Sequence, residues 1–173
     1  HWNTKNSTRF DGADLGGVAA LVSRAVYPAT QAENRPDLAI VFAPDDWPGG
    51  LVAAPLLRPL NAVLLPATAN VAIEIEQLGP TGSDALNGIQ VLLIGSAELS
   101  DTDFAVQRTS LDELTALRRE LSPPPRHALV VSSGDAATAL LAAPWAAYSG
   151  DLVVLDAASV PPGMPSFALG NAV

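Results

Sequence analysis

The loop "VVSSGDAAT", residues 130–138, contains the residues that come closest to a ligand-binding motif. Ser132, Ser133 and Gly134 follow an apolar run, and Asp135 opens an alanine-rich segment. A loop of this kind between a strand and a helix binds phosphate through free backbone N–H groups and the helix dipole. The loop lacks the lysine and glycines of a P-loop and has no G-x-G-x-x-G pattern, so simple N-capping is the stronger interpretation.

A second loop, "PDDWPGG" at 44–50, follows another apolar run and has the same kind of composition. Asp46 is placed to cap the next helix, with Pro48 in its first turn. Trp47 offers either a stacking platform for a sugar or a packing residue, and both interpretations stay open. Because parallel sheets bind ligands at the carboxyl ends of their strands, a pocket is expected at the loops 44–50 and 132–138, with Asp46, Trp47, Ser133 and Asp135 as candidate ligand-binding residues.

The sequence nominates no catalytic residue. It contains no cysteine and two histidines, His1 and His127, neither of which has a nucleophile or carboxylate fixed beside it by spacing. A magnesium site would need Asp45 or Asp46 to meet Glu98 or Asp135 from neighbouring strand ends, and capping is the simpler role for these carboxylates. We therefore predict a non-catalytic protein with no metal and no cofactor.

The elements that position these residues alternate between strand and helix. Short apolar runs rich in branched residues predict buried strands at 37–43, 61–67, 89–95, 127–133 and 151–157, with a last strand within 167–173. Helices are predicted at 15–27, 51–57, 110–121 and 135–148, and Ser110 and Glu113 have the spacing of a capping box. The run at 70–78 fits a helix or a strand by its period, and the alternation of elements favours a helix. This alternation predicts an α/β protein with a mainly parallel sheet flanked by helices.

An internal repeat organises the chain. "LVAAPLL" at 51–57 is echoed by "LLAAPWA" at 140–146, and Pro55 and Pro144 lie 89 positions apart. The same offset pairs Asp46 with Asp135 and, without a gap, the strands on either side of each helix. We therefore predict two quasi-repeated units. In each unit the alanine pair allows close approach of a neighbouring element, and the proline bends the helix or lies near its start.

Composition and charge exclude some classes of function. The chain has 173 residues, of which 49% are apolar, and a net charge of -9. That charge repels polyanions and argues against binding of nucleic acid or an anionic membrane surface. No apolar run is long enough for a membrane span, and "HWNTKNSTRF" at the start is not a signal peptide.

Two segments resemble the bacterial cell-wall-binding repeat 2 family: "DWPGGLVAAPLLRPLNAVLLP" at 46–66 and "IQVLLIGSAELSD" at 89–101. Repeats of that family begin with an arginine-led segment and continue through a strand, a helix with Ala-Ala-Pro and an apolar strand to a strand that ends in Gly-Gly. Arg9 and Arg108 stand where the leading arginines are expected. The resemblance covers nearly the whole chain and implies a flavodoxin-like or Toprim-like α/β module.

The resemblance also implies a role, namely non-covalent attachment of exported proteins to an anionic polymer of the cell envelope. Such modules are usually present in three copies, whereas this chain has two, and Gly49 and Thr138 replace the family's aspartate. The family's Pro-Ile-Leu-Leu strand begins with Ala62 in the first unit and with Asp151 in the second. An acidic protein needs a focused basic site to hold a polyanion, and the candidates are Arg9, Arg35, Arg58 and Arg108.

The predicted organisation is a flexible lead-in at 1–12, a first repeat at 13–101, and a second, shortened repeat at 102–173 that packs with the first. The predicted function is that of an exported, non-catalytic module, outside the bacterial cell or in its wall. It would attach to a cell-envelope polysaccharide or another surface polymer, or assemble at the surface by self-association. The alternative is a domain that binds a small molecule or nucleotide at loops 44–50 and 132–138.

Overall fold

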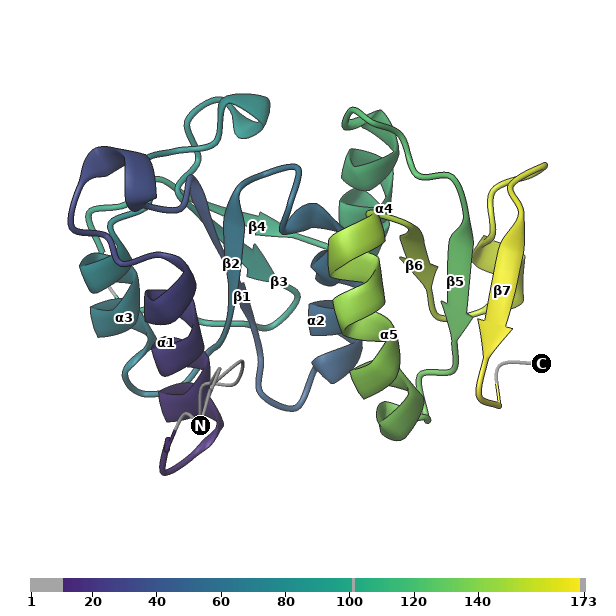
Figure 1. Cartoon of the computed structure of the whole chain (residues 1–173), viewed down its shortest axis with the longest axis horizontal. Helices are drawn as coiled ribbons and strands as arrows, with labels where there is room; N and C mark the ends of the chain where they lie inside the picture. The colour runs from purple at the N-terminus through teal and green to yellow at the C-terminus, as the bar shows by residue number, and fades with distance from the viewer. Residues whose placement is uncertain (1–10, 101, 172–173) are drawn as a thin grey trace, which may run out of the picture.

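The computed structural model describes residues 11–100 and 102–171 as an α/β structure of two parallel sheets with helices on and between them. In Figure 1, α1 and α3 lie to the left of the first sheet, α2, α4 and α5 lie between the sheets, and the second sheet lies at the right. The helices are α1 (Leu15–Val26), α2 (Trp47–Ala53), α3 (Val71–Leu78), α4 (Leu111–Glu120) and α5 (Ala136–Ser149). The expected mainly parallel α/β class is confirmed, although the strands form two sheets rather than one.

The first sheet has the strand order β2-β1-β3-β4, and all of its pairs are parallel. Its strands are β1 (Leu38–Phe42), β2 (Ala62–Pro66), β3 (Val91–Ile94) and β4 (Val106–Thr109). Side chains alternate between the two faces, as the period of a strand requires. Ala39 and Val41 pack toward α1 and α3, while Leu38 and Ile40 pack toward α2.

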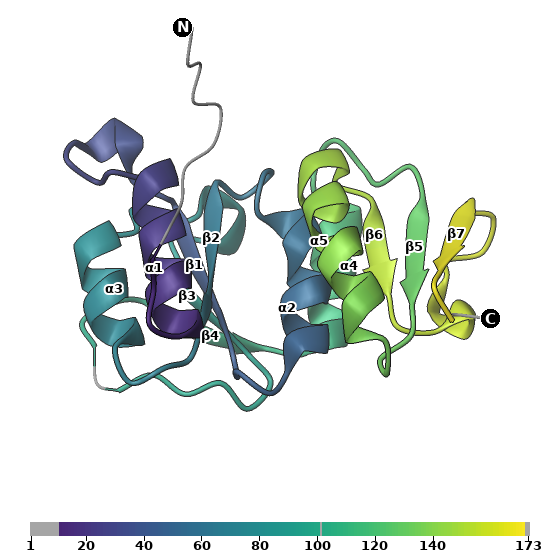
Figure 2. The same cartoon turned by 60° about the horizontal axis from the view of Figure 1, so that its bottom comes forward.

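The second sheet has the order β6-β5-β7, also parallel throughout. Its strands are β5 (Ala128–Val131), β6 (Leu152–Val154) and β7 (Ser166–Leu169). Leu129 and Val131 join the same hydrophobic core as Ile40 of the first sheet. The opposite face of the sheet is covered by the segment that holds Val160 and Met164. The two units therefore share one core, which contains the middle layer of helices (Figure 2).

The offset of 89 corresponds to equivalent positions in space. β1 pairs with β2 so that Ala39 lies opposite Val63, and β5 pairs with β6 so that Ala128 lies opposite Leu152. Asp46 caps α2, and Asp135, 89 positions further on, caps α5. β1-α2-β2 and β5-α5-β6 are thus two versions of one unit.

The second unit is shorter than the first because the helix before its last strand is missing, as the sequence predicts. α3 has only the 3-10 turn η4 (Ala157–Ser159) as its counterpart. The other 3-10 turns are η1 (Ala32–Asn34), η2 (Ala54–Leu56) and η3 (Asp84–Leu86).

β4 is the element that the sequence prediction misses. Residues 102–173 are predicted to form the second unit, yet β4 pairs with β3 and extends the sheet of the first unit. The chain then enters α4 through the predicted capping box, in which the Ser110 and Glu113 side chains each accept a hydrogen bond from the other residue's backbone N–H. The second unit therefore begins as an added strand of the first.

The two repeated prolines have different effects on their helices. Before Pro55, α2 ends at Ala53, and the chain continues as the buried 3-10 turn η2. Pro144 instead lies inside the continuous helix α5 and is exposed. The alanine pairs lie where α5 packs against η2, so their small side chains allow the close approach that the sequence predicts.

Candidate functional site

The two strand-end loops use their carboxylates to cap helices. An Asp46 oxygen accepts the Gly49 N–H at 3.1 Å. Asp135 accepts the Thr138 N–H at 3.0 Å and the Thr138 hydroxyl at 2.7 Å. Ser133 is exposed in the turn before Asp135. These loops therefore stabilise the starts of α2 and α5 and form no common polar pocket among the cavities of the described chain.

Three capping carboxylates have lowered pKa values. The Thr138 hydroxyl and N–H hold the pKa of Asp135 below its ordinary range. The Ser110 N–H and hydroxyl lower the pKa of Glu113, and the Ser159 hydroxyl and N–H lower that of Asp156. In each case the hydrogen bonds favour the ionised form.

These shifts predict acid sensitivity. A group with a lowered pKa stabilises the fold above its unfolded pKa, about 4 for a carboxyl, and the contribution is lost as pH falls through the folded value. We expect the variant E113Q/D135N/D156N to lose less stability than the unmodified protein when the pH falls from about 5 to about 2.5. Urea unfolding midpoints across this range measure the difference. An equally steep loss in the variant would contradict the assignment, and D45N, at an exposed aspartate, is the matched control.

Trp47 is the first residue of α2 rather than a loop residue, and it lines an apolar trough between the two units. We call this hollow the α2–α5 trough. Its volume is about 610 Å³, and α2, η2 and β2 line one side while α5 lines the other. Every residue that lines it is apolar or glycine, including Phe42, Leu57, Leu140 and Pro144.

A second apolar hollow, the α5–β7 trough, lies on the other side of α5. It has a volume of about 510 Å³ and is lined by Leu129, Leu141, Trp145, Phe167 and Leu169, among others. α5 therefore exposes large apolar side chains toward both troughs. Leu140 is 77% exposed, Leu141 80% and Trp145 59%.

A polar cluster supports the end of the α5–β7 trough. Asp151 is buried and accepts hydrogen bonds from the Trp145 indole at 3.3 Å and the His127 N–H at 3.2 Å. The His127 ring nitrogen Nδ1 lies 3.3 Å from the same carboxylate, and its ring packs on Phe167 with centroids 5.3 Å apart. Sequence spacing does not predict a partner for His127, because Asp151 is 24 positions away and comes close to it only through the pairing of β5 with β6. The hydrogen bond to Asp151 fixes the orientation of the Trp145 indole, although the residue remains 59% exposed.

Two of the candidate arginines, Arg58 and Arg108, lie at separate places in the described part of the chain. Arg58 donates to the Tyr148 carbonyl at 3.2 Å and lies over the Tyr148 ring, 5.8 Å from its centroid. Arg108 donates to the Gly95 carbonyl at the end of β3. Arg9 lies outside the described residues. Arg58 thus ties the first unit to the end of α5, and Arg108 ties β4 to β3.

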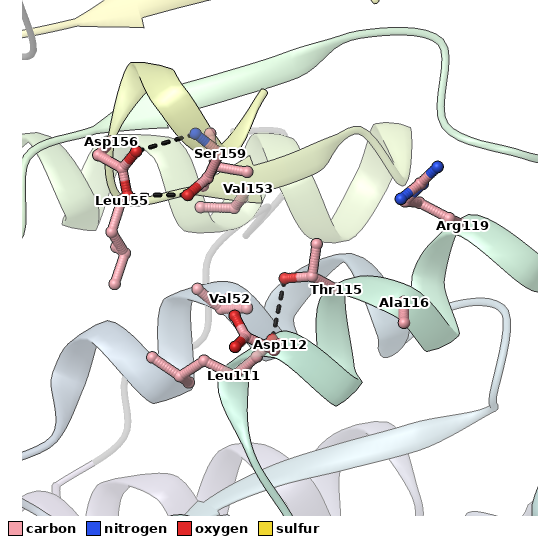
Figure 3. A pocket seen from close by; sticks show the side chains of 11 residues that line it. Val52, Leu111, Asp112, Thr115, Ala116, Arg119, Val153, Leu155, Asp156 and Ser159 are labelled. Carbon is pink, nitrogen blue, oxygen red and sulfur yellow. Dashed lines mark hydrogen bonds between the residues drawn. The ribbon is translucent and has the colours of Figure 1, made fainter. Parts of the chain in front are cut away.

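A mixed polar and apolar cleft of about 410 Å³ lies between α4 and the end of β6. Figure 3 shows that Asp156 at its rim is bonded to Ser159 and that the Thr115 hydroxyl donates to the Leu111 carbonyl. Arg119 also lines this cleft. The polar side chains of Asp156, Ser159 and Thr115 therefore already make hydrogen bonds within a turn or a helix.

The fold and these surfaces define an α/β protein of two quasi-equivalent parallel units with extensive apolar troughs. The chain matches no family model, and no curated protein matches it significantly. Within the described ranges, no group of three or more metal-binding side chains is found. The helices of the same residues are all too short or too polar to cross a membrane.

Proposed function

We propose that the protein is a non-catalytic module of the bacterial cell surface that works by assembly, with the apolar surface of α5 as its contact. The observation that carries the proposal is the exposure of Leu140, Leu141, Trp145 and Tyr148 along one helix, between two apolar troughs. Contiguous apolar patches of this kind are rare on monomeric proteins and mark interaction sites.

α5 differs in this respect from its counterpart in the first unit. Leu51 and Val52 of α2 are 4% and 5% exposed, whereas their equivalents Leu140 and Leu141 are 77% and 80% exposed. Burying one such leucine is worth about 1.5–3 kcal/mol. The chain itself buries the apolar side chains of α2. A partner that covers α5 would bury the equivalent side chains there, and the complex would be stabilised by a similar amount.

Assembly has more support than attachment to an anionic polymer. Polymer attachment requires converging cations, and Arg58 and Arg108 instead bind backbone carbonyls at separate places. The placement at a cell surface rests on the sequence resemblance. The mode of action rests on the apolar character of the troughs.

Co-sedimentation with bacterial envelopes tests the proposal, using envelopes that retain their surface proteins and walls stripped of protein. We expect binding to the former that persists at high salt, because apolar contacts are not screened. L140D/L141D should abolish it with an unchanged melting temperature. A137D, at an exposed position of α5 that lines neither trough, is the matched control.

Two outcomes count against assembly. Sedimentation with stripped walls that salt reverses would indicate polymer attachment by the arginines. Failure to sediment with either preparation would refute the proposal.

A further inference from the structure

The α2–α5 trough has the dimensions of a site for one unbranched acyl chain. Its volume of about 610 Å³ is in the range of small-molecule sites. Ala136 and Ala147, eleven positions apart on α5, both line it. Because a helix rises about 1.5 Å per residue, the trough is about 17 Å long, close to the length of an extended myristoyl chain. The side chains that line it offer a ligand no hydrogen-bond partner, so the part of the ligand that they hold must be apolar.

One end of the trough lies beside a cation. A smaller hollow of about 350 Å³ adjoins the trough and shares with it the lining residues Leu57, Leu64 and Ala147. Arg58 lines this hollow and donates to the carbonyl of Tyr148, the residue that follows Ala147. The guanidinium of Arg58 therefore lies at the end of the trough that the last turn of α5 forms.

Arg58 has the chemistry to hold an anionic head group. It is exposed, and its bond to the Tyr148 carbonyl uses one of its five N–H donors. Within residues 11–100 and 102–171, no carboxylate forms an ion pair with it. A guanidinium presents its donors in the planar arrangement that a carboxylate matches.

The opposite end of the trough is acidic. α2 and α5 both begin at the lower edge of the molecule in Figure 1, and their first residues, Trp47 and Ala136, line that end of the trough. The residues before them are the capping aspartates Asp46 and Asp135. These carboxylates repel an anionic head group, whereas Arg58 attracts one. The charges at the two ends therefore favour an anionic ligand in a single orientation.

We propose that the α2–α5 trough binds one free fatty acid, with the carboxylate on Arg58 and the acyl chain directed toward Trp47. This inference goes beyond the proposed assembly function, which uses the exposed side chains of α5. The α5–β7 trough suits the ligand less well, because no arginine or lysine of the described residues lines it and Asp151 lies at its end. The ligand enters free rather than within a bilayer, because the net charge of -9 repels an anionic membrane surface.

Displacement of the fluorescent fatty acid cis-parinarate by a series of saturated fatty acids tests the inference. We expect one molecule to bind per chain. The affinity should rise up to myristate, by at most about fourfold per added methylene, because each methylene buried in the trough contributes transfer free energy. Longer acids should gain little, because their extra methylenes lie outside the trough. Bound myristate should also raise the melting temperature by mass action.

Two adjacent positions at the start of α5 test where the acyl chain lies. Ala136 lines the α2–α5 trough and Ala137 lines neither trough, and both are exposed. A136W should shorten the trough and weaken myristate binding about tenfold, which corresponds to the exclusion of roughly two methylenes. A137W is the matched control and should bind myristate like the unmodified chain.

R58Q tests the position of the head group. We expect it to weaken myristate binding about fivefold, the size of an exposed ion pair. Binding of tetradecanol, which has the same chain and a neutral head group, should not change. R119Q is the matched control, because Arg119 is an exposed arginine that lines neither the trough nor the adjoining hollow.

Three results would overturn the inference. These are myristate that does not displace the probe, an A136W variant that binds myristate like A137W, and an R58Q variant that binds it like R119Q. Binding to phosphatidylglycerol vesicles without binding of free myristate would also overturn it. Thermal melts check that each variant is folded. Envelope sedimentation that L140D/L141D abolishes would support the proposed function even if no fatty acid binds, so the two proposals fail separately.

Discussion

Replacing Leu114 with alanine is expected to lower the free energy of unfolding by about 2–5 kcal/mol. Leu114 is the fully buried residue of α4 and belongs to the core that joins both sheets. The lost transfer free energy and the remaining cavity both contribute, and rigid helices on either side limit collapse of the cavity. Urea unfolding at neutral pH measures the change.

The matched control for Leu114→Ala is Leu141→Ala. Leu141 is 80% exposed, so removing its side chain should change stability by no more than about 0.5 kcal/mol. A loss below about 1 kcal/mol for Leu114→Ala would mean that α4 is not part of the common core. We also expect one cooperative transition rather than two, because both sheets pack on the same layer.

Replacing Arg118 with alanine is expected to cost about 3 kcal/mol. Arg118 is 3% exposed, and its Nε donates to the Gly150 carbonyl at 2.8 Å. Both of its Nη atoms donate to the Pro123 carbonyl at 3.0 Å, and Nη1 also donates to the Leu121 carbonyl at 3.3 Å. Removing the guanidinium leaves these acceptors unpaired and disconnects α4 from the end of α5 and from the turn at 121–123. Burial lowers the pKa of Arg118, with nearby Asp151 acting in the opposite direction.

Arg119→Ala is the control for Arg118→Ala, because Arg119 is the exposed neighbour on the same helix and its loss should be nearly neutral. Arg118→Lys separates charge from geometry. Lysine keeps the charge but lacks the planar fork, so we expect it to recover only part of the loss. Full recovery would show that the fork geometry is not needed. Chemical denaturation of the three variants side by side provides the comparison.

Local patterns predict most of the elements because the information for them lies in neighbouring residues. The apolar runs at 37–43 and 151–157 become β1 and β6, and the capping pattern of Ser110 and Glu113 marks the start of α4. The offset of 89 predicts equivalent capping by Asp46 and Asp135. Hydrogen bonding within one turn of a helix determines each cap, so the spacing is sufficient.

The arrangement of the sheets depends on contacts between distant residues. β4 is short and polar, with Gln107 and Arg108 exposed, and only its pairing with β3 makes it a strand. One open sheet and two separate sheets have the same alternation of strands and helices, so the alternation does not distinguish them. Within the middle layer, the alanine pairs at 53–54 and 142–143 lie where α5 packs closely against the end of α2 and η2.

The candidate site illustrates the same limit. Arg58 is a residue of the type that binds anions. In the structure it instead donates a hydrogen bond to the backbone carbonyl of Tyr148, 90 positions away. Trp47 is an aromatic residue next to turn residues, yet the helix begins with it. One signal for α5 is present in the sequence, because residues 136–149 contain no charged side chain. A helix without a polar face is normally covered, whereas α5 leaves Leu140, Leu141 and Trp145 exposed, and the proposed assembly role starts from this difference.

β4 also determines where the chain would separate if it were cut. A protease that opens the connection at 95–105 would not release two independent halves, because β4 would stay paired with β3 while α4 stays packed in the common core. The two fragments would remain together and would be expected to refold only as a complementing pair. The boundary of the sequence repeat is therefore not a boundary of autonomous folding, and any fragment designed to stand alone must extend beyond it.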